Sequence, residues 1–244
     1  KMRNVPISLA RLMAAAPHRM LFLVGAANVL AAMAWWASWL VATRWHPGEA
    51  VQPPLPAGWM HAIIMQYQVL PPFMFGFLLT VFPRWLSLKP LTPRHYLPVG
   101  VGLLGGQVLT LASLAGNLAL LRAGALFTLG GWIVGMTLLA RIVLRAQGRP
   151  WHALSCLLGL GFGLVGLTFY VLLTFRVDAQ VAFVAIKFGG IPMLLPVYFT
   201  VCHRMIPFFT SGVVPFVTAF RPGWLLAAMV AAPVAHGLLD AAGW

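Results

Sequence analysis

WHALSCLLGLGFGLVGLTFYVLL, residues 151–173, is a continuous apolar stretch without a charged side chain. A helix of about 20 such residues crosses the hydrocarbon core of a bilayer. Comparable stretches occur near residues 20–42, 58–82, 97–116, 119–144, 180–208 and 223–241. The sequence therefore predicts an all-α fold, a polytopic transmembrane helical bundle of about seven spans.

The composition of the whole chain is typical of a membrane protein. Of its 244 residues, 61% are hydrophobic and 8% are charged, against roughly 45–50% and about 25% in a soluble domain. The net charge is +13, but the 16 Lys and Arg stand singly between apolar stretches. Nucleic-acid binding requires a basic patch or stripe. We therefore expect no nucleic-acid partner and assign the basic residues to orientation in the bilayer.

The basic residues are unevenly divided between the two sides of the predicted spans. Only Arg44, Arg122 and Arg176 fall on one side, and Lys187 lies within a span; the others share the opposite side. Because cytoplasmic loops carry an excess of Lys and Arg, we expect the N-terminus in the cytoplasm and the C-terminus outside.

Two spans contain residues that interrupt helices. The second has Pro71-Pro72 after Gln66 and Gln68, and the sixth has Gly189-Gly190 followed by Pro192. We expect both to kink, either for packing or to line a cavity with polar backbone.

Lys187 is the one charge well inside a span. It either reaches the interface through its long stem or pairs with Asp240 at the outer end of the seventh span.

Seven histidines and only three acids favour metal or haem ligation over carboxylate chemistry. Towards the outer face, His61 and His236 lie at similar depth, with Met65 one turn from His61. Opposed imidazoles, or a His and Met pair, are axial ligands of haem. The alternative for each histidine is a polar anchor at the interface.

Towards the cytoplasmic face, Cys202, His203 and Met205 offer a thiolate, an imidazole and a thioether, and His18 and His152 lie at comparable depth. Such soft ligands suit copper(I) as well as haem. Neighbours on a helix point about 100° apart, so Cys202 and His203 share an ion only where the helix is broken. Otherwise Cys202 is a packed apolar thiol.

Several segments resemble the NnrS family of polytopic membrane proteins. They are PHRMLF (17–22), HAIIM (61–65), GFLLTVFPRW (76–85) and HRMIPFFT (203–210), within a resemblance that covers about residues 15–212. The resemblance implies a haem- and copper-containing protein of the bacterial inner membrane, associated with denitrification and resistance to nitric oxide. Family members commonly have about twelve spans, so residues 1–244 are expected to be one transmembrane domain, either whole or the N-terminal part of a longer protein.

One motif departs from the family pattern, which has His-Ala-His-Glu-Met where this chain has His61 to Met65. Ile63 and Ile64 replace the second His and the Glu. Ligation implied by the resemblance therefore rests on His61 and His203, with His18 or His236.

The leading hypothesis is a haem- or copper-binding membrane protein that responds to nitric oxide as a ligand. No carboxylate relay is visible within the spans, which favours a role other than catalysis. Two alternatives remain. One is a transporter or channel without a cofactor, using Lys187, Gln66 and Gln68 near broken helices. The other is an accessory subunit whose Trp-rich faces contact a larger respiratory or denitrification complex.

Overall fold

The computed structural model describes residues 12–45 and 51–243, which form helices and connecting turns without a strand. The prediction of seven spans is confirmed, because seven helices or helix pairs are long and apolar enough to cross a bilayer. They comprise α2 (Pro17–Trp45), α3 (Ala57–Ile64) with η1 (Met65–Val69) and α4 (Leu70–Trp85), α5 (Pro93–Ala112) with η2 (Ser113–Ala115), α6 (Leu118–Leu144), α7 (Trp151–Phe175), α8 (Ala179–Gly189) with α9 (Ile191–Val213), and α10 (Gly223–Ala241).

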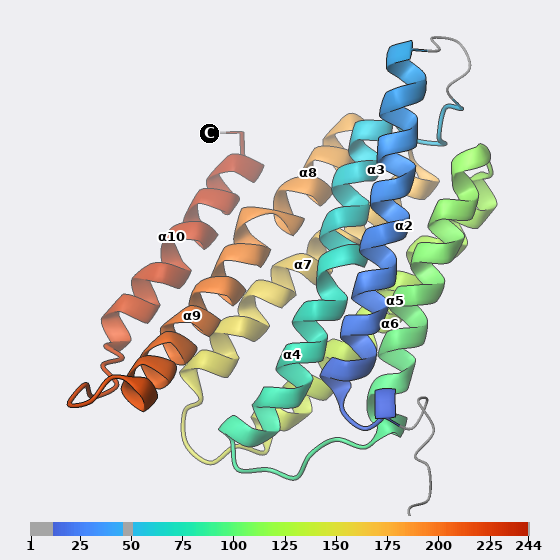
Figure 1. Ribbon diagram of the computed structural model, residues 1–244. Coiled ribbons are helices and arrows are strands. Elements are labelled where there is room, and N and C mark those ends of the chain that lie inside the picture. The colour runs from blue at the N-terminus through green and yellow to red at the C-terminus, as the bar shows by residue number, and fades with distance from the viewer. Residues whose placement is uncertain (1–11, 46–50, 244) are drawn as a thin grey trace, which may run out of the picture.

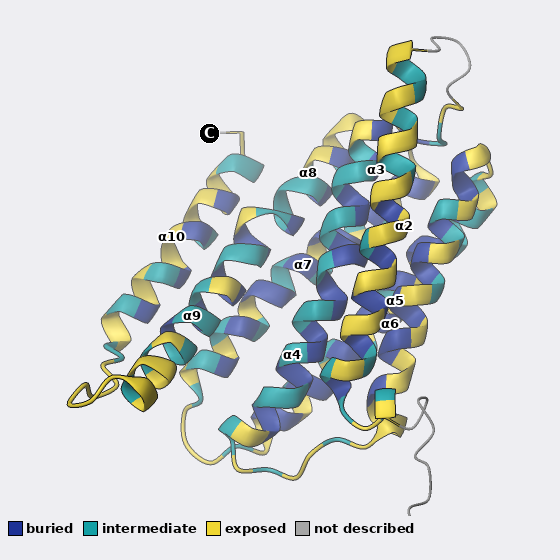
Figure 2. Cartoon of the chain, in the orientation of Figure 1, coloured by how far each residue is buried: buried dark blue, intermediate teal, exposed yellow. Residues whose placement is uncertain are grey.

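The spans form one bundle in which neighbours in sequence are mostly neighbours in space (Figure 1). α2 packs on α4, α5 on α6, α6 on α7, α7 on α9, and α9 on α10. Buried residues line the inner faces of the helices and exposed residues cover the outer faces (Figure 2). At the centre, the rings of Phe75 and Trp132 meet edge to face at 5.2 Å between centroids. The exposed apolar faces suit a bundle surrounded by lipid.

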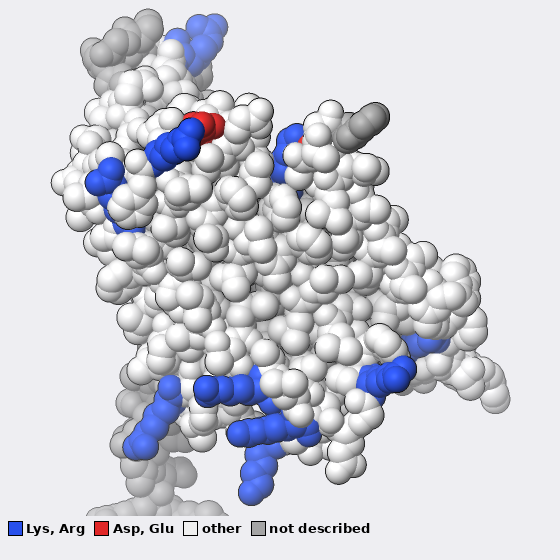
Figure 3. All heavy atoms as spheres, turned by 180° about the vertical axis from the view of Figure 1, so that it is seen from behind, with Lys and Arg blue, Asp and Glu red and all other residues white. Residues whose placement is uncertain are grey.

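Charged residues gather at the two ends of the bundle and leave its middle band apolar (Figure 3). We call one end the acidic end, because it carries Asp178 and Asp240, the two acids among the described residues. The opposite end, called the basic end, carries Arg19, Arg84, Lys89, Arg94, Arg141, Arg145, Arg149, Arg204 and Arg221.

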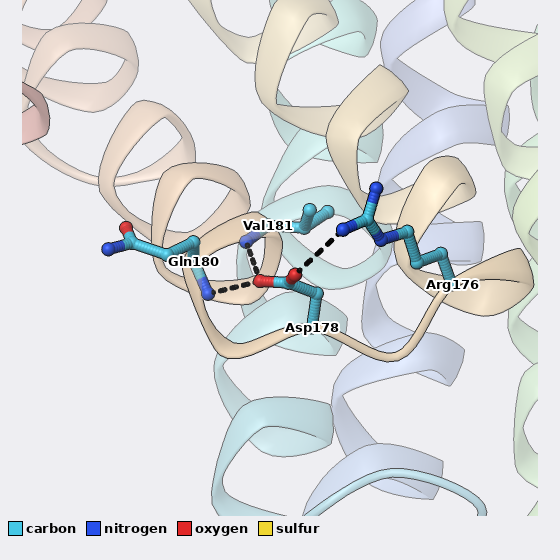
Figure 4. A network of polar contacts seen from close by, with 4 residues as sticks. All are labelled: Arg176, Asp178, Gln180 and Val181. Carbon is cyan, nitrogen blue, oxygen red and sulfur yellow. Dashed lines mark hydrogen bonds and ion pairs between the residues drawn. The ribbon is translucent and has the colours of Figure 1, made fainter.

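Side chains close the turns between spans at both ends. At the acidic end, the carboxylate of Asp178 accepts hydrogen bonds from the backbone N–H groups of Gln180 and Val181 at the start of α8. The guanidinium of Arg176 lies 3.6 Å from the other carboxylate oxygen (Figure 4). A carboxylate at a helix N-terminus satisfies free N–H groups and the helix dipole together. This polar contact is therefore a helix cap.

The second span is irregular where the sequence predicts a kink, because the π-helical turn η1 ends at Val69, two residues before Pro71-Pro72. In an α-helix the two missing N–H groups would leave the carbonyls of Tyr67 and Gln68 without their donors. Trp132 Nε1 donates to the Tyr67 carbonyl at 3.1 Å, and Asn28 Nδ2 donates to the Gln68 carbonyl at 2.7 Å. Donors from α6 and α2 thus replace the bonds that the prolines remove.

The side chains of η1 hold the two halves of the bundle together. The Gln68 amide donates to the hydroxyls of Thr110 and Thr128 on α5 and α6, at 2.8 and 3.0 Å. On the other side, the side chains of Gln66 and Tyr67 donate to carbonyls in the last turns of α8. These polar groups therefore serve packing between spans, which is the first of the two interpretations that the kink allowed.

The sixth span is broken at Gly190, as the sequence predicted. α8 ends at Gly189 and α9 begins at Ile191, with φ −86° and ψ −116° at Gly190 between them. Pro192 sits in the first turn of α9, where its missing N–H costs no helical hydrogen bond.

Of the two alternatives for Lys187, the structure has the pair with Asp240. Lys187 Nζ lies 3.1 Å from Asp240 Oδ1 and donates to the Asp240 carbonyl at 2.6 Å. Because α8 carries Lys187 and α10 carries Asp240, the pair ties the last span to the sixth.

Candidate functional site

The main cavity of functional interest lies at the basic end, where α7 and α10 begin and α9 approaches its end. It encloses about 680 Å³ and is lined by Arg149, His152, His203, Arg204 and Arg221 together with apolar side chains. Ligand pockets typically enclose about 300–1,000 Å³, so this cavity is large enough for a small molecule. Pro150 and Pro222, at the N-caps of α7 and α10, set where these helices begin beside it.

Two histidines from different spans meet in this cavity. His152 Nε2 lies 3.0 Å from His203 Nδ1, and His203 Nε2 lies 3.1 Å from the carbonyl oxygen of Pro222. A carbonyl only accepts, so His203 Nε2 carries a hydrogen. In a neutral His203, Nδ1 is then the acceptor for the hydrogen on His152 Nε2. The hydrogen bonds therefore run in one direction, from His152 on α7 to His203 on α9, and from His203 to the Pro222 carbonyl before α10.

A metal ion would take the place of the hydrogen bond in this pair. Two imidazole nitrogens that bind one ion tetrahedrally at about 2.1 Å lie about 3.4 Å apart, with both lone pairs directed at the ion and not at each other. A metal-bound histidine usually donates its other N–H to a carbonyl or carboxylate, as His203 does to Pro222. Within residues 12–45 and 51–243, no group of three or more His, Cys, Asp or Glu is placed to hold a metal. The histidine pair therefore offers two protein ligands and leaves further positions to other groups.

The structure does not bring Cys202 or Met205 to this pair. Both are half-buried residues of α9, and neither lines the cavity that His203 lines. Their side chains leave the helix in other directions, because consecutive residues are rotated by about 100°. Their assignment as metal ligands stays a prediction.

His18 lies elsewhere at the basic end, at the start of α2. Its backbone N–H donates to the Thr80 hydroxyl at 3.1 Å, and its Nδ1 lies 3.2 Å from the same oxygen. Thr80 in turn donates to the Gly76 carbonyl on α4. These contacts connect α2 with α4, and His18 is not part of the wall of the cavity.

Near the acidic end, His61 on α3 stacks on Trp36 of α2, with centroids 4.3 Å apart and an interplanar angle of 10°. Its Nδ1 is buried and has no hydrogen-bond partner among the described residues. Met65, the first residue of η1, lies one turn further along the same span. His61 therefore has a ring nitrogen without a described hydrogen-bond partner, one turn away from a thioether on the same span.

His236 is not brought to His61 by a ring stack or a hydrogen bond in the described part of the chain. It is an exposed residue of α10, and α10 packs on α9, α8 and α7 whereas α3 packs on η1, α8 and α2. The two histidines are therefore predicted at equal depth in the bilayer, but no described contact joins their side chains.

Ile63 and Ile64, which depart from the family motif, are both fully buried in the core. A histidine and a glutamate at these positions would need buried hydrogen-bond partners. In this chain the two positions serve apolar packing.

The sequence placed His152 at the depth of His203, but His152 was not among the predicted site residues. Arg149, Arg204 and Arg221 were predicted to set topology, with some of the basic residues also contacting anionic lipid. Depth was the available signal, since all of them stand at one end of their spans. Their direction around the helix axis was not available from a single sequence.

The comparisons with known proteins gave one result. A family model described as NnrS protein matches residues 12–244, nearly the whole chain. Searches of the curated proteins and of the solved structures found no match.

Proposed function

The chain belongs to the NnrS family, and from this premise we propose that it is a haem- or copper-binding membrane protein of the nitric-oxide response. The proposed setting is the bacterial inner membrane, with the basic end in the cytoplasm, where Lys and Arg accumulate. The proposed role is sensing or protection. Turnover of the gas would need delivery of protons, and the two described acids both stand at the acidic end.

The observation that carries the proposal is the histidine pair in the cavity at the basic end. His152 Nε2 and His203 Nδ1 are 3.0 Å apart, and the Pro222 carbonyl orients His203. His203 is 7% exposed, so an ion held there would be shielded from water. Imidazole binds copper and haem iron alike. A copper or iron centre would supply a site for a diatomic ligand that reaches it through the bilayer.

Metal content after substitution tests this assignment. We expect His203→Ala and His152→Ala each to reduce bound copper at least about tenfold, because each removes a ligand or its partner. The measurement is elemental analysis of the detergent-purified protein after expression with copper.

The matched control is His95→Gln at the same end. Thr92 and His95 form a capping box at the start of α5, and glutamine at this position preserves such a box. The control should retain the metal of the wild-type protein. Equal copper in all four proteins would contradict the assignment to His152 and His203.

We assign haem to His61, near the acidic end. His61 has the unpartnered Nδ1 and the neighbouring Met65, so we expect His61→Ala to abolish or shift the low-spin reduced-minus-oxidised spectrum while bound copper is unchanged. An unaltered spectrum would remove His61 from the set of ligands. Loss of both haem and copper on replacing His61 would contradict the assignment of the two cofactors to separate ends of the bundle.

A further inference from the structure

The arginines of the cavity are not explained by metal binding. Arg204 and Arg221 are half-buried, and the Arg204 guanidinium lies 4.5 Å from the centroid of the Trp85 ring. Arg221 Nε is buried and has no hydrogen-bond partner among the described residues. Arg149, at the rim, is 6.0 Å from the Trp151 ring centroid. Half-buried guanidinium groups that have no carboxylate partner are a strong attraction for an anion.

Nothing described at this end neutralises these charges. Asp178 and Asp240, the acids of the described chain, form their ion pairs at the acidic end. The N-termini of α7 and α10 also open towards the cavity, and neither has a side-chain cap. Helix N-termini add partial positive charge and free N–H groups. The cavity therefore favours a ligand with several anionic oxygens, such as a phosphate group.

An apolar groove lies deeper in the bilayer, between α4 and α9. It encloses about 500 Å³ and is lined on α4 by Phe73 and Phe77, on α9 by Leu194, Tyr198 and Val201, and by other apolar residues. α4 packs on α2 and α6, whereas α9 packs on α7 and α10, so the two helices leave space between them. Tyr198 is 62% exposed, which places the groove on the outer surface of the bundle.

The groove and the charged cavity are connected through two aromatic rings, because Phe77 of the groove lies with its ring centroid 6.4 Å from that of Trp85 in the cavity. Arg204 and Trp85 line the cavity, while Val201 and Phe77 line the groove on the same two helices. At a rise of about 1.5 Å per residue, Val201 lies about 5 Å deeper than Arg204, and Phe77 about 12 Å deeper than Trp85. A phospholipid has the same order of groups with depth, because its phosphate would lie at the arginines and its acyl chain deeper, in the groove.

We propose that the basic cavity and the apolar groove together bind one anionic phospholipid. Arg204 and Arg221 hold its phosphate, Arg149 contacts the headgroup at the rim, and the groove between α4 and α9 holds an acyl chain. Charge complementarity selects an anionic lipid over a zwitterionic one, because the same arginines would repel the positively charged quaternary ammonium of a choline headgroup. This inference goes beyond the proposed function and does not depend on a bound metal.

The test is native mass spectrometry of the full chain in detergent, with phosphatidylglycerol or phosphatidylcholine of equal chain length added in separate titrations. An arginine near a membrane contributes about 1 kcal/mol to anionic-lipid binding, or about fivefold in affinity. We expect the wild-type protein to retain phosphatidylglycerol more than about tenfold better than phosphatidylcholine. The double variant Arg204→Gln, Arg221→Gln should bring this ratio to within about twofold. Equal retention of the two lipids by the wild-type protein would overturn the proposal.

Matched controls separate this site from general attraction to the basic end. Arg141→Gln with Arg145→Gln removes two exposed charges outside the cavity and should leave the ratio unchanged. Val201→Trp fills the groove and should lower retention of phosphatidylglycerol although all arginines remain. Retention unaltered by Val201→Trp, or reduced equally by both arginine pairs, would overturn the two-part site.

Inorganic phosphate separates a lipid from a free anion. In a thermal unfolding series, we expect phosphatidylglycerol to raise the melting temperature of the wild-type protein and millimolar phosphate to leave it unchanged. An equal rise with phosphate would mean that the site binds a free anion. Copper content is measured in the same samples, and we expect the arginine variants to retain it, so failure of the lipid proposal and failure of the metal assignment are distinguishable.

Discussion

Replacing Gly102 with alanine is expected to lower the melting temperature of the protein by about 2–12 °C. A Cβ at this position on α5 would lie 2.5 Å from Cα and 2.7 Å from the backbone nitrogen of Gly131 on α6. No side chain is available to rotate away, so the helix backbones themselves must separate. Overpacking of this kind costs about 1–3 kcal/mol, and each kcal/mol lowers the melting temperature of a chain of this size by about 2–4 °C.

The close approach continues along the two helices, which makes separation at one point costly for the rest. A Cβ at Gly124 would lie 2.8 Å from the backbone nitrogen of Thr110. Small residues at helix interfaces allow such contact in membranes, where packing replaces the hydrophobic effect as the force between helices.

The control is Gly130→Ala, next to Gly131 on α6. Gly130 is exposed, and a Cβ there would meet nothing within 4 Å. Alanine favours helix by up to about 1 kcal/mol over glycine, so the melting temperature should stay equal or rise slightly. Thermal unfolding in detergent, followed by circular dichroism, measures both variants. Similar melting temperatures for Gly102→Ala and Gly130→Ala would contradict the packing assigned to α5 and α6.

The spans were predictable from the sequence because a bilayer requires long apolar helices, and this requirement is local. The stretch 151–173 became α7, Trp151–Phe175. Interruptions were predictable for the same reason, since Pro71-Pro72 and Gly189-Gly190 act on their own helix. The structure adds the form of each interruption, a π-helical turn in one span and a break at Gly190 in the other.

The partners of the interruptions were not predictable, because they come from distant parts of the chain. Nothing local to Asn28 indicates that its amide replaces the donor lost at Pro72. The candidate site shows the same limit. Depth placed His203 level with both His18 and His152, but only the rotation of each helix decides that His152 is the hydrogen-bond partner. His61 and His236 also share a depth, yet α8 packs against both of their helices and α3 and α10 are not among the packed pairs of described helices.

Asn28→Leu is expected to destabilise the protein by about 1–2 kcal/mol, because it leaves the Gln68 carbonyl without its donor in the centre of the bundle. Asn28 is 1% exposed, and its Nδ2 donates to this carbonyl at 2.7 Å. An unsatisfied buried carbonyl costs about 1–3 kcal/mol, although hydrogen bonds measured within membranes reach only about 1.7 kcal/mol. The melting temperature should fall by about 2–8 °C.

Thr168→Val is the control for loss of a polar group within a span. Thr168 is exposed on α7, and its hydroxyl donates only within its own helix, to the Leu164 carbonyl. That carbonyl is also bonded by the helix, so the variant should melt within about 1 °C of the wild-type protein. An equal fall in both variants would mean that the loss at Asn28 is not specific to the carbonyl of Gln68.

A second substitution, at Pro72, tests whether the Asn28 amide replaces the hydrogen bond that this proline cannot donate. Pro72→Ala restores a backbone N–H at the position from which an α-helix donates to the Gln68 carbonyl. In that background Asn28→Leu should cost less than in the wild-type protein, and the difference in a double-mutant cycle measures the shared carbonyl. Additive effects of the two substitutions would show that Asn28 and Pro72 act on separate groups. A positive coupling would show that the proline in one span and the asparagine in another act as one structural device, in which α2 supplies the donor that the second span lacks.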